Sequence, residues 1–221
     1  MKRYLTYIVI IFAAVIFGSC GKDSFDYKEG YVGSSKITVY PIITVTGDDY
    51  IVVPKGTAYT DPGATAKVGN DNVDVATKSP VNVNAAGVYT ITYSATNSDG
   101  YSATATRRVV VYSTDASAKN NDFSGNYART TNGSVAEWTK IAPGVYSVFN
   151  PGGAPGTDLT VIVFNQTGNE VYIPQQNASD GSLTSSSDES STPGPNGTLT
   201  KYSMVIVNAG YGAAVRTFNK Q

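Results

Sequence analysis

The stretch from residue 87 to 112 most strongly constrains the fold, because it has the pattern of a β-hairpin. One face of its first half carries apolar side chains, and the other carries, after Val88, only Thr and Ser; the apolar positions are Tyr89, Ile91, Tyr93 and Ala95. Such alternation is typical of a strand with one buried face. Residues 97–100, Asn-Ser-Asp-Gly, supply a turn, and a second alternating run ends at Tyr112. We therefore predict two long antiparallel strands here.

The composition extends this prediction to most of the chain. The 221 residues include 22 Gly and 16 Tyr, but only two Met, one Trp and no His. Abundant Thr, Ser, Val and Asn accompany them, as expected of short strands joined by tight turns. We predict an all-β fold with almost no helix after residue 20. The formal net charge of −1 gives no indication of nucleic acid as a partner.

The amino terminus has the organisation of a secretion signal. Lys2 and Arg3 are positively charged, residues 4–17 are mostly apolar, and Gly18 and Ser19 precede Cys20. The apolar run is shorter than the roughly 20 residues that a spanning helix needs. We predict a signal peptide over residues 1–19, with a retained anchor helix as the alternative. Cys20 is the only cysteine, so an intramolecular disulfide is excluded.

Residues 17–20, Phe-Gly-Ser-Cys, resemble the lipobox of bacterial lipoproteins. This resemblance implies that Cys20 is diacylated and becomes the first residue of the mature chain, which would hold the protein to a membrane. A free exposed thiol is the alternative. Residues 20–36 are predicted to form a flexible tether. Lys22-Asp23 partly resembles the acidic signal that sends Bacteroidetes lipoproteins to the outer face of the outer membrane.

Residues 37–112 are predicted to form an immunoglobulin-like sandwich. About seven short apolar segments follow one another there, separated by turn residues at regular intervals. This part of the chain contains neither the disulfide of antibody domains nor a tryptophan, so its core must consist of Val, Ile, Ala and Tyr.

The same residues resemble a known family, the bacterial Ig-like domain shared by an insecticidal crystal toxin and many Bacteroidetes surface lipoproteins. The matching motifs occur in the family's order: Val-Pro-x-Gly at 53–56, Tyr-x-Asp-Pro-Gly-Ala-x-Ala at 59–66, Gly-x-Tyr-x-Ile-x-Tyr at 87–93, the turn at 97–100 and Arg-x-Val-x-Val at 107–111.

Three polar features of this predicted sandwich have structural interpretations. Tyr89 lies where a tyrosine corner would place its ring in the core and its hydroxyl on the backbone. Arg107 shares the inward parity of Val109, so either a bulge reorients it or a carboxylate meets it, and Asp61 is the expected partner. The acidic turns near residues 48 and 71 could hold calcium, but their spacing is not that of an EF-hand. We therefore favour solvated turns and predict no metal or cofactor.

A small polar linker is predicted at 113–121, followed by a second antiparallel β domain at 122–221. We expect this domain to be a meander that closes as a small barrel or folds as a sandwich. The expected strands are 126–130, 135–141, 145–149, 159–164, 170–173, 199–208 and 211–218. The segments 159–164 and 204–207 are apolar on both faces and are predicted to be central. The Ser-, Gly- and Pro-rich stretch at 177–198 is predicted to be a mobile loop.

The residue inventory argues against an enzyme. Without His or a second Cys, the usual Ser-His and Cys-His nucleophiles and His-based metal sites are excluded. A glycosidase needs only two carboxylates, but the available ones lie in turns or at exposed strand positions and are interpreted as solvated surface charge: Glu137, Asp158, Glu170 and Asp180.

Carbohydrate binding fits the second domain better, because sugars stack on exposed aromatic rings. Trp138 has the opposite parity to Val135 and Ile141, so it faces outward if those two are core residues. Tyr172 is flanked by Val171 and Ile173 in the same way and lies close to the amides of residues 175–177; Tyr211 flanks a turn. We predict Trp138, Tyr172 and Tyr211 as carbohydrate-binding residues. The alternative for each is a partly buried structural aromatic.

The order of lipobox, Ig-like module and β-rich domain resembles that of small surface lipoproteins from the polysaccharide-utilization loci of gut Bacteroidetes. The resemblance implies an accessory glycan-binding protein at the cell surface, with a polysaccharide or oligosaccharide as ligand. The alternative is a structural spacer, or a lipoprotein that docks onto an outer-membrane transporter or partner lipoprotein. Exposed aromatics would favour the first, and an apolar patch or open strand edge the second.

Overall fold

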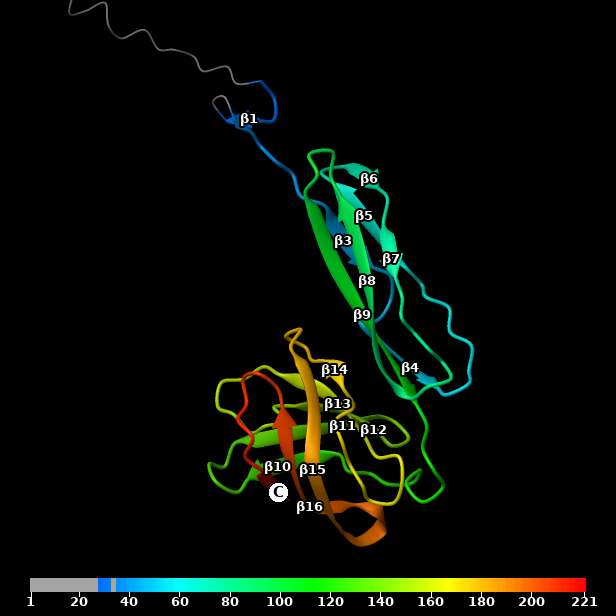
Figure 1. Ribbon diagram of the computed structural model, residues 1–221, viewed down its shortest axis with the longest axis vertical. Coiled ribbons are helices and arrows are strands. Elements are labelled where there is room, and N and C mark those ends of the chain that lie inside the picture. Colours follow the sequence, from blue (N-terminus) through cyan, green and yellow to red (C-terminus); the bar gives the residue numbers. More distant parts are fainter. Residues whose placement is uncertain (1–27, 33–34) are drawn as a thin grey trace, which may run out of the picture. The chain divides into compact units, whose positions relative to one another are not determined.

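The computed structural model of the protein describes residues 28–32 and 35–221 (Figure 1). The predicted signal peptide at 1–19, Cys20 and the first part of the tether therefore lie outside the described residues. Residues 28–39 contain a small antiparallel pair, β1 (Tyr31–Val32) and β2 (Ser35–Lys36). Residues 40–221 form a separate unit. Within the described residues, no helix has the length and apolar character needed to cross a bilayer.

The predicted immunoglobulin-like sandwich is confirmed as two sheets. The smaller has the strand order β3-β5-β6, and the larger has the order β4-β9-β8-β7. Their bounds are β3 (Ile42–Val45), β4 (Tyr50–Pro54), β5 (Ala64–Val68), β6 (Asp71–Val73), β7 (Ala76–Lys78), β8 (Gly87–Thr96) and β9 (Ser102–Tyr112). All pairs are antiparallel except β4 with β9, which run parallel.

The hairpin β8–β9 has the predicted turn and faces. It pairs continuously from Gly87 opposite Val111 to Thr96 opposite Ser102. Ile91 and Tyr93 are completely buried in the sandwich core, while the Thr side of β8 remains partly exposed. The turn is held by Asn97, whose Oδ1 accepts hydrogen bonds from the amides of Asp99 and Tyr101.

Residues 125–220 form one eight-stranded sheet that nearly closes into a barrel, with the order β13-β12-β11-β10-β17-β16-β15-β14. Its strands are β10 (Gly125–Arg129), β11 (Val135–Ala142), β12 (Val145–Phe149), β13 (Thr160–Phe164), β14 (Gln176–Asn177), β15 (Leu183–Pro193), β16 (Leu199–Val207) and β17 (Arg216–Lys220). A single 3₁₀ turn, η1 (Pro195–Gly197), connects β15 to β16. The all-β fold class is therefore confirmed, and of the forms left open for the second domain the barrel is the one found.

A side chain, in place of backbone pairing, bridges the two end strands of this sheet. The amide of Gln176 on β14 accepts a hydrogen bond from the backbone N–H of Ile162 on β13 at 2.8 Å and donates to the carbonyl of the same residue at 2.7 Å. Gln176 is buried. It therefore satisfies both backbone groups of Ile162, which would otherwise be unpaired at an edge.

Two predictions about this part of the chain are wrong. The expected mobile loop at 177–198 contains β15, which is hydrogen-bonded along β16. Its Ser-rich side chains need not fill the core, because Met204 and Ile206 of β16 do so. The strand β13, expected to be central, instead lies at one end of the strand order.

The apolar character of β13 on both faces has another cause. Val161 and Val163 point into the barrel core, whereas Ile162 and Phe164 belong to a second cluster that includes Val110 of β9. The outer face of β13 is thus buried against the sandwich. The segment 113–121, predicted to be a linker, also packs on the barrel through its buried residues Ala118 and Asn121. The boundaries proposed for independently folding domains remain predictions.

Candidate functional site

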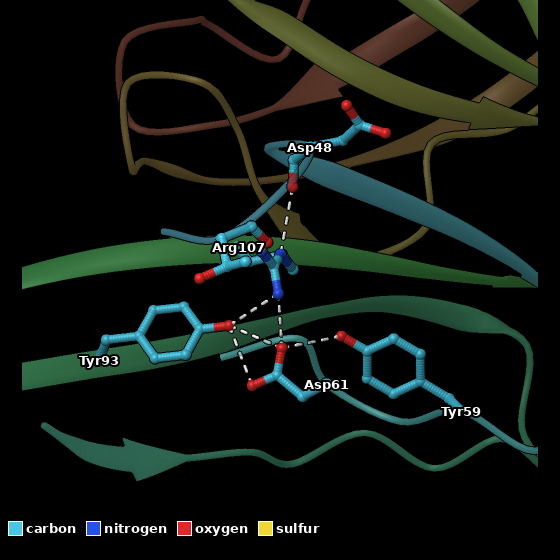
Figure 2. Close-up of polar contacts among 6 residues, drawn as sticks. Asp48, Tyr59, Asp61, Tyr93 and Arg107 are labelled. Atoms are coloured by element: carbon cyan, nitrogen blue, oxygen red, sulfur yellow. Dashed lines mark hydrogen bonds and ion pairs between the residues drawn. The ribbon is translucent and has the colours of Figure 1, made fainter. Parts of the chain in front are cut away.

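A buried polar network in the sandwich confirms the predicted pairing of Arg107 with Asp61 (Figure 2). Arg107 is fully buried, and its Nη1 donates to Asp61 Oδ1 at 2.6 Å. The hydroxyls of Tyr93 and Tyr59 donate to the same carboxylate at 2.8 and 3.2 Å. Arg107 Nε donates to the Asp48 carbonyl at 3.1 Å, and Nη2 donates to the carbonyl of Thr46.

The electrostatics of this network are those of a structural element. Burial alone would raise the pKa of Asp61, but hydrogen bonds from Tyr93, the Gly63 amide and Arg107 outweigh it and lower that pKa. Burial and the Asp61 carboxylate raise the pKa of Tyr93 to about 12, so its hydroxyl stays protonated. The donors and acceptors of the network are satisfied by one another, so the network stabilises the sandwich and has few free polar groups that could bind a ligand. Tyr89 has the expected corner role, with its hydroxyl donating to the Ala85 carbonyl at 2.9 Å.

Trp138 does not face outward, and this prediction is wrong. Its side chain is 3% exposed and lies in the barrel core, where Nε1 donates to the hydroxyl of Tyr202 at 3.2 Å. Val135 and Ile141 instead share the outward parity of the exposed Glu137. Ile141 packs against the cluster that the barrel forms with the sandwich, so its apolar character does not mark the barrel core. Ala136 and Trp138 form the inward face. Trp138 is therefore unavailable to a ligand in this structure.

Tyr172 has the orientation that its parity predicts. Val171 and Ile173 on either side of it are buried in the barrel core, and Tyr172 itself is half-buried on the outer side. Its backbone exchanges two hydrogen bonds with Phe164, at 2.9 and 3.0 Å. The two rings meet edge to face, with centroids 5.8 Å apart. These contacts hold the Tyr172 ring in a fixed position.

Tyr172 lines an open cleft of about 500 Å³ between the 170–172 segment and β15. The other lining residues are Glu170, Val171, Glu189, Ser190 and Ser191. Glu189 follows Asp188, which has a positive φ of 52° at a register irregularity of β15. An irregularity of this kind changes the direction of neighbouring side chains, and here Glu189 lines the cleft.

The polar groups of this cleft suit a hydroxyl-rich ligand. Both carboxylates are exposed and accept hydrogen bonds from nearby hydroxyls, Glu189 from Ser186 at 2.5 Å and Glu170 from Thr167 at 3.2 Å. Burial raises the pKa of Tyr172, so its phenol remains a donor at neutral pH. The aromatic ring offers an apolar surface, and the carboxylates and hydroxyls beside it offer hydrogen-bonding groups.

Tyr211 lies elsewhere. It packs against the barrel core and lines a second groove of about 430 Å³, together with the exposed apolar residues Leu183 and Val207. The cleft at Tyr172 and this groove share no lining residue. The structure therefore does not bring the three predicted aromatics together: Trp138 is in the core, and the two tyrosines belong to different surface features.

Sequence reasoning missed Glu189, Ser190 and Ser191 because their segment was interpreted as a loop. One signal could have revealed the strand. Between Gly181 and Pro193 there is neither Gly nor Pro, whereas Pro193 to Gly197 is rich in both. An uninterrupted stretch ended by turn residues is compatible with a strand even when its side chains are almost all polar.

The fold and the site together define an all-β chain in which an Ig-like sandwich precedes a barrel-like domain with an open polar cleft. Residues 43–111 match the family model of the bacterial surface protein, Ig-like domain, which agrees with the sandwich described above. The comparison with curated proteins gives no match.

The comparison with solved structures includes three matches, each with a TM-score below 0.5. A lipoprotein from Bacteroides thetaiotaomicron is 21% identical with a TM-score of 0.41, and the match covers 82% of this chain and 100% of that one. The M60 catalytic domain with the CBM51-1 and CBM51-2 domains of ZmpB from Clostridium perfringens is 14% identical with a TM-score of 0.29, covering 84% and 21%. CBM51-2 in complex with GlcNAc, with INT domains of the same protein, is 16% identical with a TM-score of 0.28, covering 81% and 43%.

Proposed function

We propose that this protein is a non-catalytic surface lipoprotein that binds a glycan in the cleft at Tyr172. Cys20 carries the lipid anchor, and the protein is held at the outer membrane, facing the cell exterior. The observation that carries the glycan-binding proposal is the cleft itself, because it combines a fixed aromatic ring with two exposed carboxylates and the hydroxyls of Ser190 and Ser191.

Each part of the cleft has a role in this proposal. The Tyr172 ring offers an apolar surface for the C–H face of a sugar, and its contact with Phe164 limits the entropy lost on binding. The carboxylates of Glu170 and Glu189 accept hydrogen bonds from sugar hydroxyls. Charge-assisted hydrogen bonds of this type are stronger than neutral ones, so they would fix the orientation of the sugar.

The same carboxylates favour binding over catalysis. A glycosidase needs one carboxyl group that stays protonated, and this usually requires burial in an apolar pocket. Glu170 and Glu189 are both exposed to solvent. We therefore infer that they act as hydrogen-bond acceptors and not as a catalytic pair.

A second candidate function is docking to a transporter or partner lipoprotein. It is favoured by the groove beside Tyr211, where Leu183 is 58% exposed and Val207 is 47% exposed. Apolar side chains exposed together on a surface are typical of protein interfaces.

Calorimetric titration of the full chain in mild detergent, against plant, host and microbial polysaccharides, tests the glycan proposal. We expect Tyr172→Ala to weaken binding of the recognised glycan about tenfold or more, since a stacked ring contributes about 1 kcal/mol beyond its buried area. Glu189→Gln should also weaken it. The matched control is Tyr101→Ala, which removes an exposed tyrosine of the sandwich. Unchanged affinity in Tyr172→Ala, or no binding across the panel, would contradict the proposal and favour docking to a protein.

A further inference from the structure

Two arginines point into the same end of the barrel. Arg129 has the inward parity of Tyr127 on β10, and Arg216 has the inward parity of Phe218 on β17; both aromatic rings are fully buried. Arg129 pairs directly with Phe218, which makes Arg216 its diagonal neighbour on the adjacent strand. Diagonal neighbours on adjacent strands lie about 7–8 Å apart, and their β-carbons are somewhat closer. Arg129 and Arg216 therefore extend from neighbouring positions on the inner face, and Arg216 is only 8% exposed.

Two glycine-containing loops cover this end of the barrel. Arg129 Nη1 donates to the carbonyls of Gly153 and Gly152 at 3.2 and 3.4 Å, and Arg216 Nη1 donates to loop carbonyls of Ala214 and Gly212 at 3.0 and 3.3 Å. The Arg216 guanidinium lies 5.0 Å from the centroid of the Tyr211 ring. We call Arg129, Tyr211 and Arg216 the mouth cluster.

The mouth cluster has positive charge without a counter-ion. Among the described residues, neither guanidinium has a carboxylate oxygen within the 4.0 Å that defines an ion pair. Burial and then the charge of Arg129 lower the pKa of Arg216, and a contribution from Tyr211 in the opposite direction does not cancel them. Arg107 shows the contrast, because its buried guanidinium has Asp61. Buried charges in proteins are normally paired, since an unpaired one is costly.

Several polar atoms of the mouth cluster also lack partners. Arg129 Nε, Arg216 Nε and the Tyr211 hydroxyl are buried and have no hydrogen-bond partner in the described part of the chain. Both Nη1 atoms are used by loop carbonyls. The Nη2 atoms of Arg129 and Arg216 make no hydrogen bond to any described residue. Unlike the two Nε atoms, they are not fully buried, so they remain available to a ligand.

We propose that the mouth cluster is an anion-binding site that takes a carboxylate or sulfate group. Such a group has oxygens that can accept hydrogen bonds from both Nη2 atoms, and arginine is well suited to this planar recognition. The mouth of a β-barrel is a common place for a ligand. An anion would neutralise part of the local charge of two guanidinium groups. This site is separate from the Tyr172 cleft and does not depend on the function proposed for that cleft.

The test measures binding of defined anions to the full chain in mild detergent at low ionic strength. Calorimetric titrations use sodium sulfate, glucuronate, a polygalacturonate and neutral glucose. We expect anionic ligands to bind more tightly than glucose, with an affinity that falls as NaCl is added. Equal binding of sulfate and glucuronate would identify a site for free anions, whereas binding of the polymer alone would identify an acidic polysaccharide as the source.

Arg216→Gln should lower the affinity for the anion about tenfold or more, because it removes a charge-assisted hydrogen bond. The matched control is Lys201→Gln, which removes an exposed cation on β16 and should leave the affinity unchanged. If Arg216→Gln does not fold, Arg129→Gln is the replacement variant. In a separate measurement, the anion should raise the melting temperature of the wild type but not of the Gln variants. Glucose binding as tightly as glucuronate, no anion binding, or an unchanged affinity in a folded Gln variant would overturn the proposal.

Discussion

Removal of the Asp61 carboxylate is expected to destabilise the sandwich strongly. In Asp61→Asn, the fully buried guanidinium of Arg107 loses the partner that lies 2.6 Å from its Nη1. Tyr93 and Tyr59 lose a charged acceptor at the same time. Breaking a buried pair in this way typically costs about 3–5 kcal/mol, whereas an exposed pair is worth about 1 kcal/mol or less.

This free energy predicts a large change in melting temperature. For a unit the size of residues 40–221, 1 kcal/mol corresponds to about 2–4 °C, so we expect a decrease of about 6–20 °C. Urea denaturation followed by circular dichroism gives the free energy directly. The matched control is Asp71→Asn, which alters an exposed carboxylate in the same sandwich and should change stability by about 0.5 kcal/mol at most. A loss of less than about 1 kcal/mol in Asp61→Asn would refute the reasoning that Arg107 depends on this carboxylate.

The pH dependence provides an independent check. The pKa of Asp61 is lowered in the folded protein, because hydrogen bonds to its carboxylate outweigh the effect of burial. Its stabilising contribution is therefore fully present above the unfolded pKa of about 3.9 and is lost as the pH falls through the lower folded value. Wild-type stability should decrease below about pH 4, and Asp61→Asn should lack that part of the decrease.

Two further predictions concern the barrel. Trp138→Phe should lower the free energy of unfolding, measured by urea denaturation, by about 1–3 kcal/mol, because it removes the hydrogen bond to Tyr202 and some core volume. It should leave glycan affinity unchanged. A loss of affinity without loss of stability would show that Trp138 belongs to the binding site. Gln176→Leu should lower the free energy of unfolding by about 2 kcal/mol or more and speed hydrogen exchange of the Ile162 amide, since both backbone groups of Ile162 lose their partner. The control Gln175→Leu, at an exposed position, should do neither.

The sandwich could be predicted well from the sequence because its signals are local and mutually consistent. The alternation of β8 and the turn at residues 97–100 determine the hairpin without reference to distant residues. Even the long-range pair of Arg107 and Asp61 was predictable, since an inward-facing charge needs an opposite charge nearby. The family match over residues 43–111 covers the same part of the chain.

The barrel was harder to predict because its determinants are irregularities and long-range contacts. Ile141 is apolar because it packs on the outer face of the barrel, against the cluster shared with the sandwich, so it could not mark the inward face that holds Trp138. β15 is held by its backbone pairing with β16 and not by apolar side chains. Its Ser-rich sequence therefore lacks the hydrophobic alternation by which a strand is recognised. The cleft at Tyr172 depends on that strand, which is why Tyr172 was predicted but Glu189 was not.

The position of β10 has a consequence for the order in which the protein can fold. β10 pairs on one side with the neighbouring β11 and on the other with β17, where Tyr127 lies opposite Lys220. The pairing of β10 with β17 closes a loop that contains all the strands between them. Closing so long a loop is slow, because the chain must lose conformational entropy before the contacts form. The sandwich strands are all available once residue 112 has been synthesised, but the barrel cannot close until β17 (Arg216–Lys220) has emerged. Until then the aromatic interior of the barrel stays open, and this interval is when aggregation most threatens a newly made chain.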